Sequence, residues 1–484
     1  MAQTRMLAFT HVEQRTPDKR DPGERTHDFR EISARFAVPS AQVQAERCSQ
    51  CGVPFCQVHC PLQNNIPDWL MLAAEGRLRE AYEVSAATST MPEICGRICP
   101  QDRLCEGSCV IEQSGHGAVT IGAVEKFLTD TAWDEGWVEP LVPLADRSGQ
   151  SVGIVGSGPA GLTAAELLRR QGYAVHVHER ADRPGGLLTY GIPGFKLEKD
   201  VVMRRIARLE GGGVVFHLNS EIGRDLSFAE LRARHDALFL ATGVYRAREA
   251  GVPGASRPGV VRALDYLVAS NRVGFGDSVP AFASGELDAR GRHVVVVGGG
   301  DTAMDCVRTA VRQGAASVTC LYRRDRANMP GSAQEVTHAE EEGVRFQWLA
   351  APRAFEGEGA AGPVRAVVAE RMRLGAADSS GRRAPEPEAG TEYRLPADLV
   401  IEALGFDPED LPGLFGVPEL RTSRWGTVLT TTGHATSLPG VFAGGDIVRG
   451  ASLVVWAMRE ARDAAGEIGE YLRQAASRGL KEAA

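Results

Sequence analysis

Two glycine-rich turns and eight cysteines predict an α/β protein in which a helical, cysteine-rich N-terminal domain precedes two Rossmann-like dinucleotide-binding domains. The turns, near Gly156 and Gly298, each follow an apolar strand and open a helix, which is the context that dinucleotide binding requires. The cysteines all lie before residue 110, ahead of both turns. At 484 residues, the chain has room for about three domains.

Composition is typical of soluble globular proteins, with 43% hydrophobic and 24% charged residues. No apolar run approaches the roughly 20 residues that a membrane-spanning helix needs, so no membrane partner is expected. The net charge of −8 argues against binding to nucleic acid, whose phosphates attract basic surfaces. The N-terminus, MAQTRMLAFT, lacks the layout of a secretory signal, and we expect a cytoplasmic location.

The eight cysteines predict two iron–sulfur clusters. They form two runs: Cys48, Cys51, Cys56, Cys60, and Cys95, Cys99, Cys105, Cys109. The first run opens with C-x-x-C, a spacing that lets one turn of backbone wrap a cluster held by thiolates. Zinc is a weaker alternative because the second run lacks a C-x-x-C pair. Disulfides are disfavoured because a cytoplasmic chain keeps its thiols reduced.

Three further parts of the sequence predict structural features. Residues 67–88 have apolar residues at helical spacing and predict one helix that separates the cysteine runs in sequence and brings them together in space. Cys306 and Cys320 lie in a predicted helix and strand and are expected in a core. Residues 356–393, rich in Gly, Ala, Pro and charge, predict a hairpin with a long mobile tip.

The first glycine turn carries both halves of a dinucleotide-binding fingerprint. Gly156 permits the tight turn, Gly158 lets the backbone approach a pyrophosphate, and Gly161 lets the helix pack close to the strand. The N-terminus of that helix faces the phosphates. Glu179, eighteen residues past Gly161, ends the next strand, where an acid binds ribose hydroxyls.

Later stretches resemble the FAD-binding half of flavoprotein reductases of the adrenodoxin-reductase and glutathione-reductase kind: ADRPGGLLTYGIP, ALFLATG and GVFAGGDIVRGAS. By this resemblance FAD contacts Gly156, Gly158, Pro159, Ala160, Gly161, Glu179, Arg180, Gly186, Leu187, Thr242, Gly243, Gly445, Asp446, Ser452 and Leu453. Asp446 would bond the ribityl chain, and the helix starting near Ser452 would point its N-terminus at the pyrimidine edge of the flavin, favouring the anionic reduced form. Alternatively, Asp446 only caps the next helix.

The second turn predicts NADPH. It consists of Gly298, Gly299, Gly300, Asp301 and Thr302, with Ala303 in place of the third glycine. The following strand ends in Arg323 and Arg324, where NAD sites present an acid, and arginines suit a 2′-phosphate. In the alternative interpretation these arginines form surface salt bridges.

Longer strings resemble one family from about residue 40 to 475. CSQCGVPFCQVHCPLQNNIPDWL, MPEICGRICPQDRLCEGSC, GGLLTYGIPGFKLEKD, LYRRDRANMPG and AGGDIVRGASLVVWAMREAR are similar to the small (beta) subunits of bacterial NADPH-dependent glutamate synthases. The reductase half of dihydropyrimidine dehydrogenase is related. The resemblance implies that cluster ligands cross between the cysteine runs. One 4Fe-4S cluster would take Cys48, Cys51, Cys56 and Cys109; the other would take Cys60, Cys99, Cys105 and either Glu125 or Cys95.

The resemblance also implies an activity. NADPH would reduce FAD, and electrons would pass through the clusters to a large (alpha) subunit that carries FMN and the glutaminase site and makes L-glutamate from L-glutamine and 2-oxoglutarate. No catalytic side chain is assigned, because the cofactors perform hydride transfer. A reductase subunit serving ferredoxin or a dihydropyrimidine dehydrogenase is the alternative enzyme. A zinc-bound scaffold without activity is disfavoured because both fingerprints are intact.

The chain is accordingly predicted to divide into three domains. Residues 1–145 form a helical domain with two 4Fe-4S clusters, residues 146–255 and 405–484 form the FAD-binding domain, and residues 256–404 form an NADPH-binding domain inserted in it.

Overall fold

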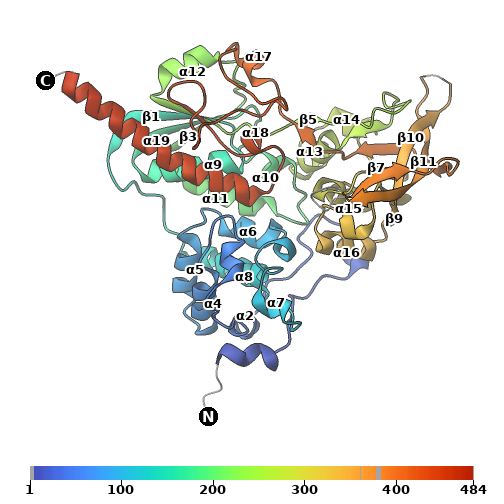
Figure 1. The fold of residues 1–484 in the computed structure, drawn as a ribbon, viewed down its shortest axis with the longest axis horizontal. Helices are drawn as coiled ribbons and strands as arrows, with labels where there is room; N and C mark the ends of the chain where they lie inside the picture. Colours follow the sequence, from blue (N-terminus) through green and yellow to red (C-terminus); the bar gives the residue numbers. More distant parts are fainter. Residues whose placement is uncertain (1–4, 360, 378–382, 483–484) are drawn as a thin grey trace.

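Three bodies of secondary structure make up the computed structural model, which describes residues 5–359, 361–377 and 383–482. A helical domain near the N-terminus, the cysteine domain, lies below two α/β domains, here called the first and second sheet domains (Figure 1). This arrangement confirms the predicted fold class. Among the described residues, no helix has both the length and the apolar character needed to cross a membrane.

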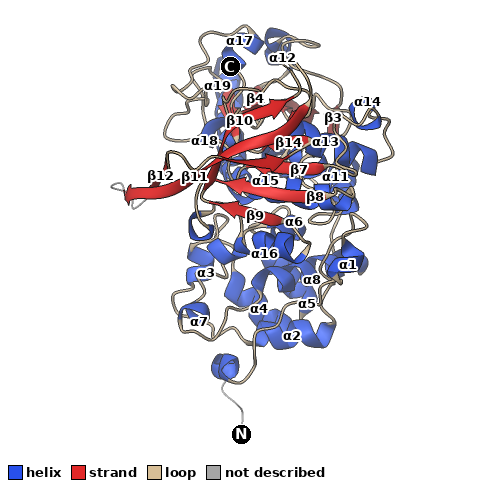
Figure 2. Ribbon diagram, turned by 90° about the vertical axis from the view of Figure 1, so that its right-hand side faces the viewer, coloured by secondary structure: helices blue, strands red, loops and turns tan. Residues whose placement is uncertain are grey.

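The cysteine domain is helical, and Figure 2 shows its helices gathered below the strands. Its elements and those leading to it are η1 (Arg5–Thr10), α1 (Pro22–Arg25), α2 (Val38–Glu46), α3 (Phe55–Val58), α4 (Ile66–Ala74), α5 (Leu78–Ala86), α6 (Pro92–Ile98), η2 (Gln101–Arg103), α7 (Val110–Gln113) and α8 (Ile121–Asp134). Helix α8 runs through the middle and contacts α2, α4, α5 and α6. Burial of apolar side chains such as Trp69, Leu70 and Phe127 against one another stabilises the domain.

The prediction of one helix over residues 67–88 is wrong, because the structure has two helices there, α4 and α5. Gly76, with φ of 77°, adopts a left-handed conformation after the end of α4 and reverses the chain. The two helices then pack against each other. Apolar periodicity continues through both helices, so it did not reveal the break that the glycine makes.

The first sheet domain is a five-stranded parallel sheet in the order β16-β4-β1-β2-β3. Its strands are β1 (Arg147–Val155), β2 (Tyr173–His178), β3 (Val214–His217), β4 (Ala237–Leu240) and β16 (Val441–Ala443). Its helices are α9 (Pro159–Arg170), α10 (Leu187–Tyr190), α11 (Lys199–Gly211), α12 (Phe228–Arg234), α17 (Leu411–Phe415), α18 (Asp446–Arg449) and α19 (Val454–Glu482). Strand β16 follows the whole second sheet domain in sequence, so that domain is an insertion.

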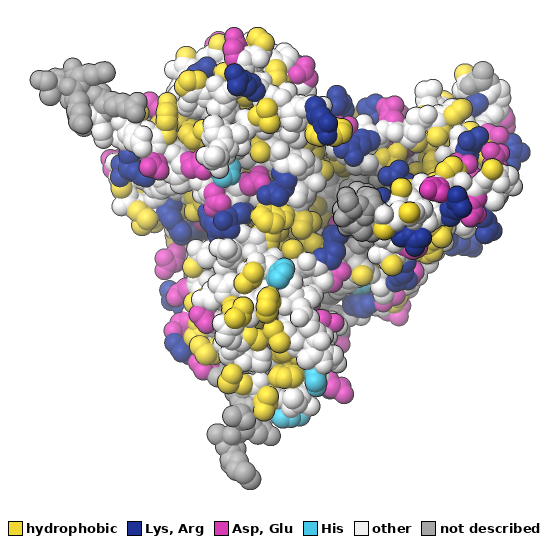
Figure 3. All heavy atoms as spheres, viewed as in Figure 1, with side chains coloured by type: hydrophobic (Ala, Val, Ile, Leu, Met, Phe, Trp, Pro, Cys, Tyr) yellow, Lys and Arg dark blue, Asp and Glu magenta, His cyan; other side chains and the backbone are white. Residues whose placement is uncertain are grey.

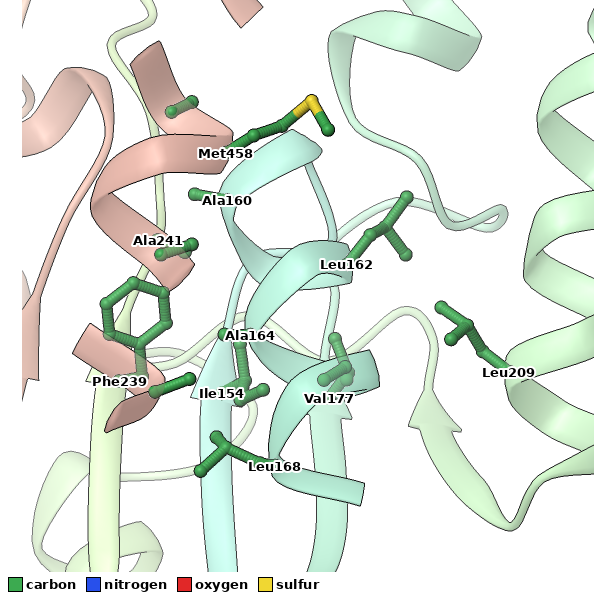
Figure 4. Packing of buried hydrophobic residues seen from close by; sticks show 14 of the residues in the cluster. Ile154, Ala160, Leu162, Ala164, Leu168, Val177, Leu209, Phe239, Ala241 and Met458 are labelled. Carbon is green, nitrogen blue, oxygen red and sulfur yellow. The ribbon is translucent and has the colours of Figure 1, made fainter. Parts of the chain in front are cut away.

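Helices α9 and α19 pack against each other, and α19 also contacts the sheet at β16; Figure 4 shows the contact between the two helices. Ile154 and Val177 of the sheet face α9, while Met458 of α19 lies over the N-terminal end of α9. Small residues of α19, including Ala461 and Ala464, are fully buried there. The close packing fixes the position of the glycine turn that joins β1 to α9.

The second sheet domain is a parallel sheet in the order β6-β14-β7-β8-β9. Its strands are β6 (Val260–Arg262), β7 (His293–Val297), β8 (Ser317–Tyr322), β9 (Arg345–Trp348) and β14 (Leu399–Glu402), and its helical elements are α13 (Ala263–Gly274), α14 (Pro280–Ala283), α15 (Asp301–Arg312), η3 (Arg326–Asn328) and α16 (Ala333–Glu341). Cys306 and Cys320 are fully buried in its core, as predicted. The residue boundaries assigned to the three domains remain predictions.

An antiparallel arm extends from the second sheet domain and confirms the predicted hairpin. It consists of β10 (Ala350–Gly357), β11 (Val364–Ala377), β12 (Arg383–Pro387) and β13 (Tyr393–Pro396). The predicted tip falls on residues 378–382, outside the described residues. Where the chain passes between the two sheet domains, β5 (Arg246–Ala247) pairs antiparallel with β15 (Phe406–Asp407).

The N-terminal segment reaches the second sheet domain through a buried ion-pair cluster. Arg25, 1% exposed, pairs with Glu341 and Glu342 at 2.7 and 2.9 Å. Glu342 also pairs with Arg308 and Arg312. Burial opposes ionisation of Glu342, but hydrogen bonds from Arg312 and Arg308 prevail and lower its pKa to about 2. The cluster ties the segment before α2 to α15 and α16.

Candidate functional site

A central cavity of 280 Å³ lies where the three domains meet. Among the residues predicted to bind FAD, its walls include Gly156, Gly158, Pro159, Ala160, Glu179, Arg180, Leu187, Thr242, Gly243, Asp446, Ser452 and Leu453. The second sheet domain contributes Asp301 and Thr302, and the cysteine domain contributes Cys99. Residues predicted from three separate stretches of the first sheet domain therefore surround one space.

Three glycines predicted to contact FAD lie behind the cavity wall rather than on it. A Cβ on Gly161 would be 2.0 Å from the carbonyl oxygen of Gly156, so this position keeps α9 close to the turn. Gly186 has φ of 53°, and a Cβ there would lie 2.8 Å from the Cα of Gly158. The backbone N–H of Gly445 donates to Glu460 at 2.7 Å. These residues shape the wall through the backbone.

Gly158 leaves its surroundings open, unlike Gly161. No atom lies within 4 Å of a Cβ built on Gly158. The residue caps the N-terminus of α9 and lines the central cavity. Helix N-termini present unpaired N–H groups and a positive dipole end to anions. A pyrophosphate therefore fits at this position.

Glu179 supports the glycine turn, a role that the sequence did not indicate. Its carboxylate accepts hydrogen bonds from the N–H and Oγ of Ser157 at 3.0 and 2.6 Å, and from the N–H of Ala181 at 2.9 Å. The Ser157 Oγ in turn accepts from the N–H of Gly185 at 3.0 Å. Ser157 was missed because the position between the first two glycines of the fingerprint carries no residue preference.

Two polar groups on the cavity wall fit a polar ligand. The Oγ1 of Thr242 is buried and has no hydrogen-bond partner among the described residues. Burial raises the pKa of Asp446 to about 7, opposed by a hydrogen bond from the N–H of Ser452. Buried polar groups normally have partners, so both side chains are suited to hydroxyl groups of a bound molecule. Helix α19 begins at Val454, two residues after the predicted start.

Lys196 is a wall residue that the predictions did not assign. Its Nζ lies 2.9 Å from Oδ1 of Asp305 on α15, and both residues line the cavity. Burial alone would lower the pKa of Lys196, but the charges of Asp305 and Glu335 outweigh it and raise the pKa. A charged residue between the buried Phe195 and Leu197 was the available signal.

The second glycine turn has the geometry of the first. A Cβ on Gly298 would lie 2.2 Å from the carbonyl oxygen of Ala403, whereas Gly300, at the N-terminus of α15, has open space. Gly298 and Gly300 do not line the central cavity, although Asp301 and Thr302 next to them do.

The two arginines after β8 are available for a ligand. Arg323 is exposed and Arg324 is half-buried, and neither forms an ion pair within the described part of the chain. The buried Nε of Arg324 has no hydrogen-bond partner there. Arg326, by contrast, pairs with Glu340 at 2.7 Å. The structure therefore does not show the surface salt bridges of the alternative interpretation.

The cysteines surround two small cavities in the cysteine domain, and both cavities draw residues from both runs. Cys48, Cys51, Cys56 and Cys109 line one, of 20 Å³, here called the outer cavity. Cys60, Cys95, Cys99, Cys105 and Glu125 line the other, of 30 Å³, here called the inner cavity. Each is larger than the roughly 10–15 Å³ that one water molecule occupies on this measure.

Local backbone turns direct the thiols into these cavities. Gln50, with φ of 52°, turns the chain between Cys48 and Cys51, and its side-chain amide donates to the Sγ of Cys48 at 3.4 Å. Cys99 ends α6 with extended backbone, and Cys109 precedes α7. Cys95 and Glu125, the two alternatives for the fourth ligand of the second cluster, both line the inner cavity.

Burial makes the thiolate forms costly without a cation. Burial raises the pKa of Cys48 to about 11 and that of Cys56 to about 12, and it raises the pKa of Cys105 well above the ordinary range. The pKa of Glu125 rises to about 8 for the same reason. Metal binding would deprotonate the thiols and release these protons. The described residues contain no group of three or more His, Cys, Asp or Glu side chains arranged around a single metal ion.

Neighbouring cavities share wall residues. Cys99 lines both the central and the inner cavity, and Val455 of α19 does the same. Ile121 lines both the inner and the outer cavity. The three cavities therefore form a row from the glycine turn of the first sheet domain to the outside of the cysteine domain.

Two family models match the chain. Residues 25–137 match the family described as dihydropyrimidine dehydrogenase domain II, 4Fe-4S cluster. Residues 150–461 match the family described as pyridine nucleotide-disulphide oxidoreductase. The first match covers the cysteine domain, and its description supports iron–sulfur clusters over the zinc alternative.

Two relatives that align over almost the full length of both chains are named glutamate synthase [NADPH] small chain. The glutamate synthase [NADPH] small chain of Azospirillum brasilense is 63% identical over 474 residues, covering 98% of each chain. The protein of the same name from Escherichia coli is 45% identical over 96% of this chain and 98% of its own. Among solved structures, FprA from Mycobacterium tuberculosis in complex with NADPH aligns at 22% identity with a TM-score of 0.58, covering 68% of this chain and 86% of its own. That similarity shows the fold of the two sheet domains.

Proposed function

Because this chain belongs to the family of NADPH-dependent glutamate synthase small chains, we propose that it is the electron-input subunit of a glutamate synthase. When bound, NADPH supplies hydride to FAD, and 4Fe-4S clusters carry the electrons onward singly. The partner is a large subunit with FMN and a glutaminase site, which forms L-glutamate from L-glutamine and 2-oxoglutarate.

The row of cavities with shared walls is the observation that carries this proposal. Cys99 stands between the central and inner cavities, so a residue proposed to hold a cluster also borders the proposed flavin site. Gly158, Thr242 and Asp446 would hold FAD in the central cavity, and the second glycine turn would hold NADPH, with Asp301 of that turn on the wall of the same cavity. The protein thus orients the cofactors and encloses their reactive parts.

The proposed cluster ligands follow the two cysteine cavities. Cys48, Cys51, Cys56 and Cys109 would hold a cluster in the outer cavity, and Cys60, Cys99 and Cys105 a second one in the inner cavity. We propose Glu125 as the fourth inner ligand. Cys95 packs its sulfur 3.8 Å from Met458 within the core of the first sheet domain, whereas the Glu125 carboxylate accepts, among the described residues, a hydrogen bond from the Ser85 hydroxyl alone.

Reconstitution with the large subunit tests the function. The holo chain, the large subunit purified from the same cells, NADPH, L-glutamine and 2-oxoglutarate are combined under nitrogen. The expected result is two molecules of L-glutamate formed per NADPH oxidised. Dye reduction by NADPH without L-glutamate formation, together with reduction of ferredoxin or a pyrimidine, would assign the chain to the alternative enzyme.

The arginines after β8 should determine the choice between NADPH and NADH. Each of Arg323→Glu and Arg324→Glu is expected to raise the KM for NADPH about 10–100-fold, since a charge-assisted hydrogen bond contributes about 1.5–3 kcal/mol. The KM for NADH should change little, because NADH lacks the 2′-phosphate. Steady-state kinetics with a one-electron dye measure both constants. Arg326→Glu is the matched control, as Arg326 already pairs with Glu340; equal effects on both cofactors would contradict the assignment.

A further inference from the structure

Four exposed apolar side chains lie on segments that carry, or adjoin, ligand cysteines of the outer cavity. Val53, Phe55, Val58 and Val110 are 60%, 41%, 59% and 38% exposed, and they belong to α3, α7 and the turn before α3. Phe55 and Val110 also line the outer cavity itself. Figure 3 shows hydrophobic side chains gathered on the visible face of the cysteine domain. Contiguous exposed apolar surface on a soluble protein marks an interaction site.

The segment that carries three of these four side chains lacks charge. Residues 51–60 contain no Asp, Glu, Lys or Arg. The centres of protein–protein interfaces are depleted of charged residues and enriched in aromatic ones, as here with Phe55. In the whole chain, 24% of residues are charged, whereas this ten-residue segment has no charged residue. The segment is therefore suited to burial against another protein.

A groove of 790 Å³ continues this surface toward the first sheet domain. Val58 belongs to both, and Cys60 lines both the groove and the inner cavity. The opposite wall consists of Thr430–His434 and residues around Trp456. Its charges are largely neutralised in pairs: Arg449 with Glu460 and Arg459 with Asp463, each at 2.6 Å. The groove has the polar composition of an interface rim.

We propose that Val53, Phe55, Val58, Val110 and the adjoining groove, together called the cluster face, form the docking surface for the large subunit. This inference rests on the proposed function. The row of cavities starts at the proposed flavin site and ends at the outer cavity, and the cluster face includes Phe55 and Val110, two exposed residues that line this last cavity. An acceptor protein must approach the end of the row to receive electrons.

A single occupant fits this position. A second copy of this chain would place one electron donor against another, with no acceptor between them. A stable complex buries about 800 Å² on each partner. The four apolar side chains form only the centre of such an area, and the groove extends it across the boundary between the cysteine domain and the first sheet domain.

Charged substitutions on the cluster face test the proposal. Val53→Glu and Val58→Glu place an unpaired carboxylate in the centre of the interface, and each is expected to weaken binding of the purified large subunit at least tenfold. Leu144→Glu is the matched control, because Leu144 is 82% exposed and lies before β1, with its backbone N–H bonded to the end of α9. Binding is measured by interferometry with the holo chain, alongside iron and flavin content and NADPH-dependent dye reduction, which should all stay at wild-type values.

The possible outcomes distinguish failure of the docking-surface proposal from failure of the proposed function. If the wild-type chain binds the large subunit and both variants bind equally tightly, the cluster face is not the docking surface. If the wild-type chain shows no binding, the proposed function fails as well. Loss of self-association in the variants would assign the surface to a second copy and overturn the proposal. Should a variant lose iron, hydrogen exchange of the wild-type complex decides instead: residues 52–60 should become protected, and unchanged exchange there would refute the assignment.

Discussion

Replacement of Cys99 by Ser should halve the bound iron and reduce electron delivery to the large subunit to background, while NADPH still reduces the flavin. Cys99 lies on the wall between the central and inner cavities. A serine hydroxyl is a poor substitute for the thiolate that an iron–sulfur cluster requires, so about one of two clusters would be lost. Iron analysis and stopped-flow reduction by NADPH measure the two parts of this result separately.

Two neighbours of Cys99 serve as matched variants. Cys95→Ser should keep wild-type iron content, because Cys95 is assigned to packing against Met458. Glu125→Ala should lose iron from the inner cavity as Cys99→Ser does. Full iron in Glu125→Ala together with loss in Cys95→Ser would exchange the roles of these two residues. Full iron in Cys99→Ser would contradict the ligand set of the inner cavity altogether.

The Gly158→Ala chain should fold like the wild type but bind FAD about 10–100-fold more weakly, a loss of about 1.4–2.7 kcal/mol. Its φ of −68° suits alanine, and no atom lies within 4 Å of the added methyl group. The methyl group would instead occupy space in the central cavity that the pyrophosphate needs. Flavin titration of the apoprotein measures affinity, and thermal unfolding of the apoprotein measures stability.

Two further variants, Gly300→Ala and Gly161→Ala, serve as controls for Gly158→Ala. Gly300 is equally open but belongs to the second turn, so its variant should weaken NADPH binding and leave FAD affinity unchanged. Gly161→Ala places a Cβ 2.0 Å from the carbonyl oxygen of Gly156, so it should lower both the Tm and FAD affinity. Wild-type FAD affinity in Gly158→Ala would show that the pyrophosphate does not approach α9 at this turn.

The glycine turns and the start of α19 could be predicted because each depends on the backbone conformation of a few neighbouring residues. Gly156 has φ of 99° and Gly298 has φ of 146°, conformations that favour glycine. The start of α19 at Val454 lies within two residues of the prediction. Residues 67–88 show the limit of such reasoning, since apolar periodicity passes unchanged through the break at Gly76 and only the packing of α5 against α4 reveals two helices.

Two wall residues of the central cavity that lie outside the glycine motifs were not predictable from a motif. Cys99 was assigned to a cluster but not to the flavin cavity, and Lys196 was not assigned at all. Cys99 lines the central cavity because α6 packs against the first sheet domain, and Lys196 lines it because the segment before α11 reaches Asp305 of α15. The cluster face is a similar case, since exposure of Val53 and Val58 depends on which helices cover α3.

The types of chemistry could be predicted from residue types and their spacing: thiolates for iron, two glycine turns for dinucleotides, and arginines in place of an acid after β8. Cysteine spacing left open which thiols share a cluster, and the grouping across the two runs came from family resemblance. Which side chains meet at one cavity depends on the packing of the helices, which brings Cys109 to Cys48 and both Cys95 and Glu125 to Cys60. The conformation of a glycine turn depends on its own dihedral angles, whereas the lining of a cavity depends on helices that are distant in sequence and pack together.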